Sequence, residues 1–331
     1  MEVAARATHK VIGRAAALLL LLAIVPGTAA AQSYPSRVVR IVVGSPPGGV
    51  VDVMGRPIAQ RLTEAFGTQV IVDNRVGATG LIANDLVAKA PPDGHMLLLT
   101  PGSFVVISPH LNPKAAHGSL ADFAPVTQIC AFHYVLAVHP SVPAKTVREF
   151  IAFARAKPGL LTFASSGAGS SFHLAGELFK ISTGIDMLHV PYKGSPPAVI
   201  DLISGRADAM FISLAVVQQH IKSGRLRALG VTGSKRDPLF PDVPTIAESG
   251  VPGYEAGGWF GFLAPAGTPK EIVDRLNAAI VKILGTAEMR DLFTAQGMEV
   301  ITSTPEQFGA KMREDYAKFG KLIKAASIKP E

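Results

Sequence analysis

The sequence predicts an α/β protein built from two domains. Its 331 residues are about twice the length of a typical domain. Short apolar runs alternate with helical stretches, an order that favours a parallel-rich sheet covered by helices. This pattern begins again after residues 135–138, which indicates a second domain. An apolar content of 48% with only 17% charged residues excludes an intrinsically disordered chain.

The first domain opens with three strands separated by two helices. Residues 38–43 read Val-Val-Arg-Ile-Val-Val, a short β-branched run typical of a buried strand. A helix is expected over 50–65, followed by a second strand over 70–72. A helix over 81–89 and a strand over 96–99 complete this part.

The second domain repeats the alternation. Thr146 and Glu149 have the spacing of a capping box, so a helix is expected to begin there. A further helix is expected from Ser195, where a cap precedes proline. The remaining elements are strands over 161–164, 188–190, 207–212 and 226–231 and a helix over 172–183.

The C-terminal part has helices and no clear strands of its own. A helix is expected after the Thr268 cap, with its apolar face at Ile272, Leu276, Ile280 and Leu284. Two more are expected over 286–295 and from residue 304. We therefore expect these helices to pack onto the sheet made earlier in the chain, which makes the first domain discontinuous. The expected divisions are 1–31 for a signal peptide, 32–131 with 259–331 for domain 1 and 132–258 for domain 2.

The first 31 residues have the layout of a secretory signal peptide. Three basic residues precede an unbroken apolar run over 15–25, and Ala29-Ala30-Ala31 offers a cleavage site. The run is too short to span a bilayer as a helix. Cleavage near Ala31 leaves 300 residues and lowers the formal charge from +7 to +5, because the segment carries three bases and one acid. The sequence thus predicts an exported protein.

The basic charge does not indicate a nucleic-acid partner. Lys and Arg are scattered, and aromatic residues make up 7% of the chain, whereas a nucleic-acid groove needs a basic stripe, often with stacking aromatics. No G-x-x-x-x-G-K-[ST], G-x-G-x-x-G or H-E-x-x-H motif is present. We expect neither a nucleic-acid partner nor a cofactor.

Three strand–turn–helix junctions are the candidates for a binding site. They cover residues 45–51, 165–171 and 192–195, and each is rich in Gly, Ser or Pro. The first N–H groups of a helix lack internal partners, and the helix dipole adds positive potential there. Such a turn can hold a carboxylate without Arg or Lys. Ligands of open α/β sheets also bind at the carboxyl ends of the strands.

Catalytic and metal-binding interpretations of these turns find little support. Ser170 could act as a nucleophile with His173 as its base, but no third residue orients such a pair. His173 and Glu177 stand four residues apart, as two metal ligands could, without a third ligand nearby. We expect no catalytic residue and no metal.

The mature chain resembles the Bug receptors, the substrate-binding proteins of tripartite tricarboxylate transporters. The resemblance extends from residue 34 to residue 330 and rests on many short motifs in order. They are Pro-Pro-Gly-Gly at 46–49 with Asp52, Val-Asp-Asn-Arg at 72–75, Pro-Asp-Gly at 92–94, Asp-Phe-Ala-Pro-Val at 122–126, Ser-Ser-Gly at 165–167, His-Leu-Ala-Gly-Glu at 173–177, Val-Pro-Tyr-Lys-Gly at 190–194, Pro-Asp-Val-Pro-Thr at 241–245 and Ala-Pro-Ala-Gly-Thr-Pro at 264–269.

The resemblance implies a type II periplasmic-binding-protein fold, with two α/β domains joined by two crossing segments around a ligand cleft. Its expected ligand is a small organic anion (a mono-, di- or tricarboxylate or an amino acid) that is delivered to the membrane permease subunits of the transporter. The location is then the periplasm, and we expect a monomer. The implied ligand-binding residues are Pro47, Gly48, Gly49, Val50, Val51, Ser165, Ser166, Gly167, Gly169, Ser170, Ser171, His173 and Tyr192.

Two positions depart from the family pattern. Ser45 stands where the family often has an aromatic residue, and Val51 where it often has Thr or Ser. The first half of the pocket is therefore expected to differ in shape and to offer fewer donors. Two other functions stay open: an exported hydrolase that uses Ser170, and a ligand-sensing partner of a membrane sensor.

Overall fold

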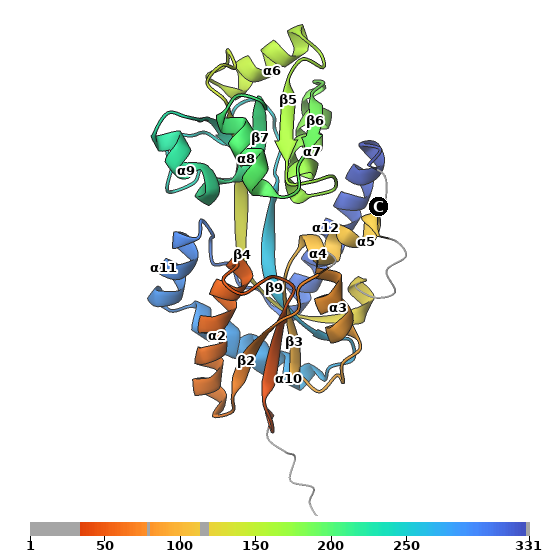
Figure 1. Cartoon of the computed structure of the whole chain (residues 1–331). Coiled ribbons are helices and arrows are strands. Elements are labelled where there is room, and N and C mark those ends of the chain that lie inside the picture. Colours follow the sequence, from red (N-terminus) through yellow and green to blue (C-terminus); the bar gives the residue numbers. More distant parts are fainter. Residues whose placement is uncertain (1–33, 78–79, 113–118, 329–331) are drawn as a thin grey trace, which may run out of the picture. The chain divides into compact units, whose positions relative to one another are not determined.

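The computed structural model describes residues 34–77, 80–112 and 119–328. Figure 1 shows strands and helices alternating along this part of the chain. The strands are β1 (Val39–Val43), β2 (Val70–Asn74), β3 (Met96–Pro101), β4 (Phe123–Val138), β5 (Thr162–Ser165), β6 (Leu188–Pro191), β7 (Ala209–Ser213), β8 (Arg227–Val231) and β9 (Gly257–Pro265). The helices are α2 (Val50–Phe66), α3 (Leu81–Ala88), α4 (Ser103–Val106), α5 (Ser108–Leu111), η2 (Leu120–Asp122), α6 (Val147–Ala156), α7 (Ser171–Thr183), α8 (Ser195–Ile203), α9 (Leu214–Lys222), α10 (Lys270–Leu284), α11 (Ala287–Ala295) and α12 (Pro305–Ala325).

The strands form two half-sheets that share β4. In the first, β1 lies parallel to β2 and β3, and β9 joins β3 to β4 through antiparallel pairs. In the second, β5 lies parallel to β6 and β7, and β4 pairs antiparallel with β7 and β8. We call these the first lobe and the second lobe. The α/β class predicted from the alternating pattern is confirmed.

The strand β4 changes partners along its length. Residues up to His133 pair with β9, and residues from Tyr134 onward pair with β7 and β8. The chain returns to the first lobe at Gly257, where β9 begins. Figure 1 shows β4 and β9 where the two half-sheets meet, and β4 is the strand that belongs to both. The exact domain boundaries stay a prediction, because 37–331 forms one compact unit.

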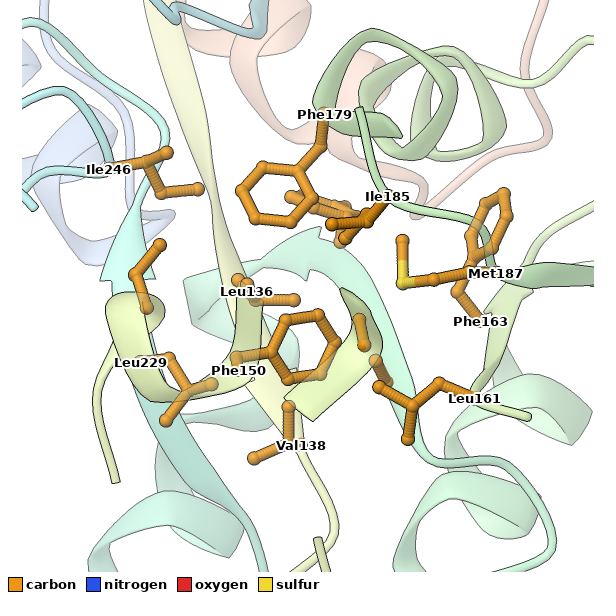
Figure 2. Close-up of a cluster of buried hydrophobic side chains, with 14 of the residues drawn as sticks. Leu136, Val138, Phe150, Leu161, Phe163, Phe179, Ile185, Met187, Leu229 and Ile246 are labelled. Carbon is orange, nitrogen blue, oxygen red and sulfur yellow. The ribbon is translucent and has the colours of Figure 1, made fainter. Parts of the chain in front are cut away.

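The core of the second lobe gathers around aromatic side chains of α6 and α7. Thr146 caps α6 by accepting the N–H of Glu149 at 3.2 Å, as predicted, but the Glu149 carboxylate accepts the N–H of Lys145 at 2.7 Å and so does not complete the capping box. This cap helps to set the start of a helix that buries Val147, Phe150 and Ala154. Phe150 and Phe179 lie 6.2 Å apart between ring centroids. Figure 2 shows them meeting Leu136 of β4 and Leu229 of β8 in one buried cluster.

The C-terminal helices complete the first lobe. Helices α10 and α12 pack against β4, so the prediction that they cover a sheet made earlier is confirmed. Helix α10 begins at Lys270 after Pro269, one residue later than the predicted cap at Thr268 implies. Its buried face is Val273, Leu276, Ile280 and Leu284, with Val273 in place of Ile272.

Several elements were missing from the sequence prediction. Strand β9 was predicted only as a crossing, and β4 was expected to cover 135–138 alone. The short helices α4 and α5 and the helix α9 were also not predicted. No helix in the described ranges is both long and apolar enough to cross a membrane. The predicted signal peptide and its cleavage site lie outside the described residues.

Candidate functional site

The first turn lies between β1 and α2. Gly48 has φ +78°, a left-handed conformation that strongly favours glycine. Pro47 and Gly48 are exposed, and Gly49 is the N-cap of α2 without a side-chain cap. Val50 points outward and Val51 is buried. The turn therefore presents backbone, and few side-chain donors, to its surroundings.

The Asp52 carboxylate stabilises this turn through hydrogen bonds. Its carboxylate is 3% exposed and accepts the N–H of Gly48 at 2.9 Å. Arg56 donates to both carboxylate oxygens, at 2.8 and 2.9 Å, and Asn74 donates to Oδ1 at 3.0 Å. These hydrogen bonds, first that of Arg56, lower the pKa of Asp52 to about 2. An ionised carboxylate of the chain itself thus occupies the Gly48 N–H that was predicted as a ligand donor.

Asn74 connects the turn to the neighbouring strand, because its side-chain amide also donates to the Ser45 carbonyl at 3.0 Å. The Ser45 hydroxyl is buried, and no partner for it exists among the described residues. The N–H groups of Val50 and Val51 lie in the first turn of α2, so they have no hydrogen-bond acceptor within the helix. They are the backbone donors that this turn can offer to an outside anion.

The second turn, between β5 and α7, is organised by neutral groups. The Ser165 hydroxyl accepts the N–H of Gly167 at 3.1 Å and lies 2.7 Å from His189 Nε2. Ser170 is the N-cap of α7 and accepts the N–H of His173 at 3.2 Å. The N–H of Gly169 donates to His173 Nδ1 at 2.9 Å. The turn is therefore closed at three points by hydroxyl or imidazole acceptors.

Glycine is required at position 169. Its φ is +70°, and a Cβ atom there would lie 2.2 Å from Leu111 Cδ1. Leu111 belongs to α5 of the first lobe. The second turn thus lies directly against the first lobe, where Gly169 is buried and Ser166, Gly167, Ser170 and Ser171 are partly exposed.

A stacked pair of imidazoles supports the second turn. The rings of His173 and His189 lie 3.6 Å apart between centroids and within 8° of parallel. Burial, and then the charge of neighbouring His173, lower the pKa of His189 to about 4. His173 Nδ1 accepts the N–H of Gly169, and its Nε2 lies 3.7 Å from Glu177 Oε1.

Glu177 belongs to a local ion pair. Burial would raise its pKa, but hydrogen bonds from His173 and Lys180 lower it overall. Lys180 Nζ lies 3.1 Å from Glu177 Oε1. In the described ranges, no three His, Cys, Asp or Glu side chains gather as a metal site would require.

The third turn is tied to the second through its backbone. Tyr192 donates its N–H to the Ser165 carbonyl at 3.1 Å, and Gly194 donates to the Ser166 carbonyl at 3.1 Å. The Tyr192 hydroxyl donates to Asp201 of α8 at 2.8 Å. The structure thus brings Tyr192 to the second turn, while its hydroxyl is engaged within the second lobe.

A cavity of about 700 Å³ lies between the lobes at the strand crossing. The first lobe contributes Ser103 and Trp259, and the second contributes Ser171 and Leu174. Ser171 is the one residue among the predicted ligand-binding set that lines it. Tyr134 also lines the cavity and was not predicted. The sequence offered one indication of its role, which is its position next to the predicted domain boundary at residue 131. The residues around it do not distinguish it from a tyrosine of the hydrophobic core.

The chain is similar to known receptors over most of its length. The model of the family described as "Tripartite tricarboxylate transporter family receptor" matches residues 54–328. BugT of Bordetella pertussis is 37% identical over 300 residues, which are 90% of this chain and 92% of BugT.

Two solved structures carry dicarboxylates in their descriptions. Rpa4515 of R. palustris with adipate is 36% identical, has a TM-score of 0.76, and is matched over 90% of this chain and all of its own. MatC of Rhodopseudomonas palustris with bound malate is 31% identical, has a TM-score of 0.70, and is matched over 88% of this chain and all of its own. The expected two-domain fold of periplasmic binding proteins is confirmed by such structures.

Proposed function

The chain belongs to the family of tripartite tricarboxylate transporter receptors, and from this premise we propose that it captures a small organic carboxylate between its two lobes. The ligand is then delivered to the membrane permease subunits of such a transporter. The receptor works in the periplasm after cleavage of the segment 1–31, as a monomer. Its two domains, 32–131 with 259–331 and 132–258, close around the ligand through the crossing strands β4 and β9.

The observation that carries this proposal is the second turn beside the interlobe cavity. The turn satisfies its inner N–H groups with hydroxyl and imidazole acceptors, those of Ser165, Ser170 and His173. The N–H groups of the first turn of α7 then face outward without an internal acceptor. A helix N-terminus of this kind favours an anion, and Ser171 at its start lines a cavity of about 700 Å³.

The relatives support a short dicarboxylate as the ligand class. One solved neighbour is described with adipate and another with malate. Both ligands are small enough for a cavity of this size, because ligand pockets usually measure about 300–1,000 Å³. We propose that this chain binds dicarboxylates of similar length.

The geometry gives no support to a hydrolase that uses Ser170. The Ser170 hydroxyl serves as the N-cap of α7, and His173 Nδ1 accepts the N–H of Gly169. His173 is therefore not positioned to remove a proton from Ser170, and a nucleophile needs such a base.

A thermal-shift screen of the mature chain tests the proposal. Ligand at a hundredfold excess over its Kd stabilises the folded state by about 2.7 kcal/mol, which raises the melting temperature by about 5 °C in a protein of this size. We expect this rise with adipate or malate and none with a diamine of matched length. A flat response to mono-, di- and tricarboxylates alike would refute the proposal.

A further inference from the structure

The hydroxyl of Tyr134 is a buried polar group whose O–H has no acceptor. The Tyr134 side chain is 2% exposed and its hydroxyl makes no well-formed hydrogen bond with any described residue. The Ser171 hydroxyl lies nearby and acts on the phenol as a donor, so it does not supply the missing acceptor. Native proteins satisfy nearly all buried polar groups, so an exception requires an explanation. A ligand that supplies the missing acceptor would be one.

The ring of Tyr134 is held firmly in place. It meets Phe172 edge-on at 5.0 Å and Phe132 at 5.9 Å between centroids. Its backbone N–H donates to Thr232 Oγ1 at 2.7 Å. These contacts fix the position of the hydroxyl. It lies at the point where β4 stops pairing with β9 and begins to pair with β7.

Tyr134 and Ser171 stand together at the start of α7. Burial raises the pKa of Tyr134 to about 12, and the nearby Ser171 hydroxyl offsets part of this rise. Both residues line the interlobe cavity. The phenol is thus protonated at neutral pH and can donate a hydrogen bond.

The other groups at this place are also donors. Ser171 is the first residue of α7, so its N–H and that of Phe172 have no internal acceptor. The Ser171 hydroxyl can donate as well. Two hydroxyls and two backbone N–H groups therefore lie at the start of α7, and a helix end of this kind favours negative charge.

Acidic residues also line the cavity, and the one that contacts Trp259 is engaged within the first lobe. Asp315 of α12 accepts the Trp259 indole N–H at 2.8 Å and lies 3.2 Å from Lys311 Nζ. This carboxylate is thereby neutralised within the first lobe. It does not compete for the donors of α7.

We propose that Tyr134 is a ligand-contacting residue whose hydroxyl, with Ser171, donates to one carboxylate of a bound dicarboxylate. This inference rests on the proposed receptor function. It adds a subsite at the strand crossing to the turns that the sequence indicated. A ligand held there touches β4 itself, the strand that joins the two lobes.

The test compares two single-atom deletions, Tyr134→Phe and Tyr254→Phe. Tyr254 is also 2% exposed, but its hydroxyl donates to the Ala175 carbonyl at 2.9 Å. Calorimetric titration with adipate and with malate gives the Kd of each variant. The single tryptophan of the chain, Trp259, lines the same cavity, so its fluorescence gives a second readout of binding.

We expect Tyr134→Phe to raise the Kd about tenfold or more, since a hydrogen bond to a charged group is lost. Its melting temperature should stay close to the wild-type value, because the phenol O–H has no acceptor among the described residues and only the Ser171 hydroxyl lies near it. Tyr254→Phe should melt at a lower temperature and keep a Kd within about twofold of the wild type. Ser171→Ala, at the same subsite, should also weaken binding.

Other results would overturn the inference. An unchanged Kd in both Tyr134→Phe and Ser171→Ala would remove the subsite while leaving the receptor function intact. A loss of stability in Tyr134→Phe equal to that of Tyr254→Phe would make the hydroxyl a structural group. A wild-type protein that binds neither probe would instead overturn the proposed function, and this inference with it.

Discussion

The first and second of the three predicted turns share a local design but are stabilised in different ways. The first turn is held by an ionised group, the Asp52 carboxylate, with Arg56 and Asn74 around it. The second is held by the Ser165 hydroxyl and the His173 imidazole, without a carboxylate. Both place a glycine with positive φ just before a helix.

This difference bears on what each turn can still bind. A carboxylate of the chain already sits at the N-terminus of α2, where it interacts favourably with the helix dipole. No such internal anion accepts the inner N–H groups of the second turn. We infer that the second turn contributes most of the binding energy of an anionic ligand, because its Ser171 lines the cavity and no residue of the first turn does.

The largest expected effect comes from removing the carboxylate of the first turn. Asp52→Ala should lower the free energy of unfolding by about 3 kcal/mol, because the buried carboxylate loses its hydrogen bonds from Gly48, Arg56 and Asn74. Urea denaturation measures this loss. The matched control is Asp274→Ala, whose pair with Lys270 is exposed and should contribute less than about 0.5 kcal/mol. Equal losses in the two variants would contradict a structural role for the Asp52 network.

The second turn should be sensitive to acid through His189. The pKa of His189 is about 4 in the folded chain and about 6.5 in the unfolded chain. The unfolded state therefore binds the proton first, so stability is complete above pH 6.5 and falls as the pH drops towards 4. Allowing for solvent screening, the loss is about 2 kcal/mol.

His189→Asn removes this titration. Urea denaturation of both proteins at several pH values should show a shallower decline in the variant between pH 6.5 and 4. If the free energy of unfolding falls equally with pH in wild type and variant, the pKa of His189 is not lowered by folding. Protonation of His189 would then not destabilise the stacked imidazoles.

A smaller effect is expected from replacing Gly48, and a comparison with Gly67 distinguishes a loss of stability from a loss of ligand binding at the first turn. Gly48 and Gly67 both have positive φ, +78° and +65°, and a Cβ atom at either position meets nothing within 4 Å. Replacing either by Ala should cost about 1 kcal/mol through the backbone alone. Gly67 lies at the far end of α2, so only Gly48→Ala should also raise the Kd for adipate.

If both variants bind adipate as the wild type does, the first turn lies outside the site. If both weaken binding equally, the effect comes from lost stability and not from ligand contact.

Local patterns predicted the elements that depend on local chemistry. The Thr146 cap and the alternating strands of both lobes could be read from the sequence, as could the turns that follow β1 and β5. Strand β9 could not, because three of its nine residues are glycine. Its existence depends on pairing with β3 and β4, which are distant in sequence. Gly261 is needed there because a Cβ atom would lie 2.2 Å from the Phe308 ring.

The site shows the same division. Arg56 lies four residues after Asp52, a spacing that predicts their contact. Asn74 reaches Asp52 from a neighbouring strand 22 residues away, and only the sheet register brings them together. Tyr134 and Ser171 are 37 positions apart in the sequence, so their meeting at the cavity could not be inferred from spacing.

Calorimetric titration of the mature wild-type chain with adipate and with malate at neutral pH tests the central claim most directly. The account predicts saturable binding of at least one of them at a single site per chain. A folded protein that gives no binding heat with either ligand, and no shift in melting temperature at millimolar concentration, would contradict it.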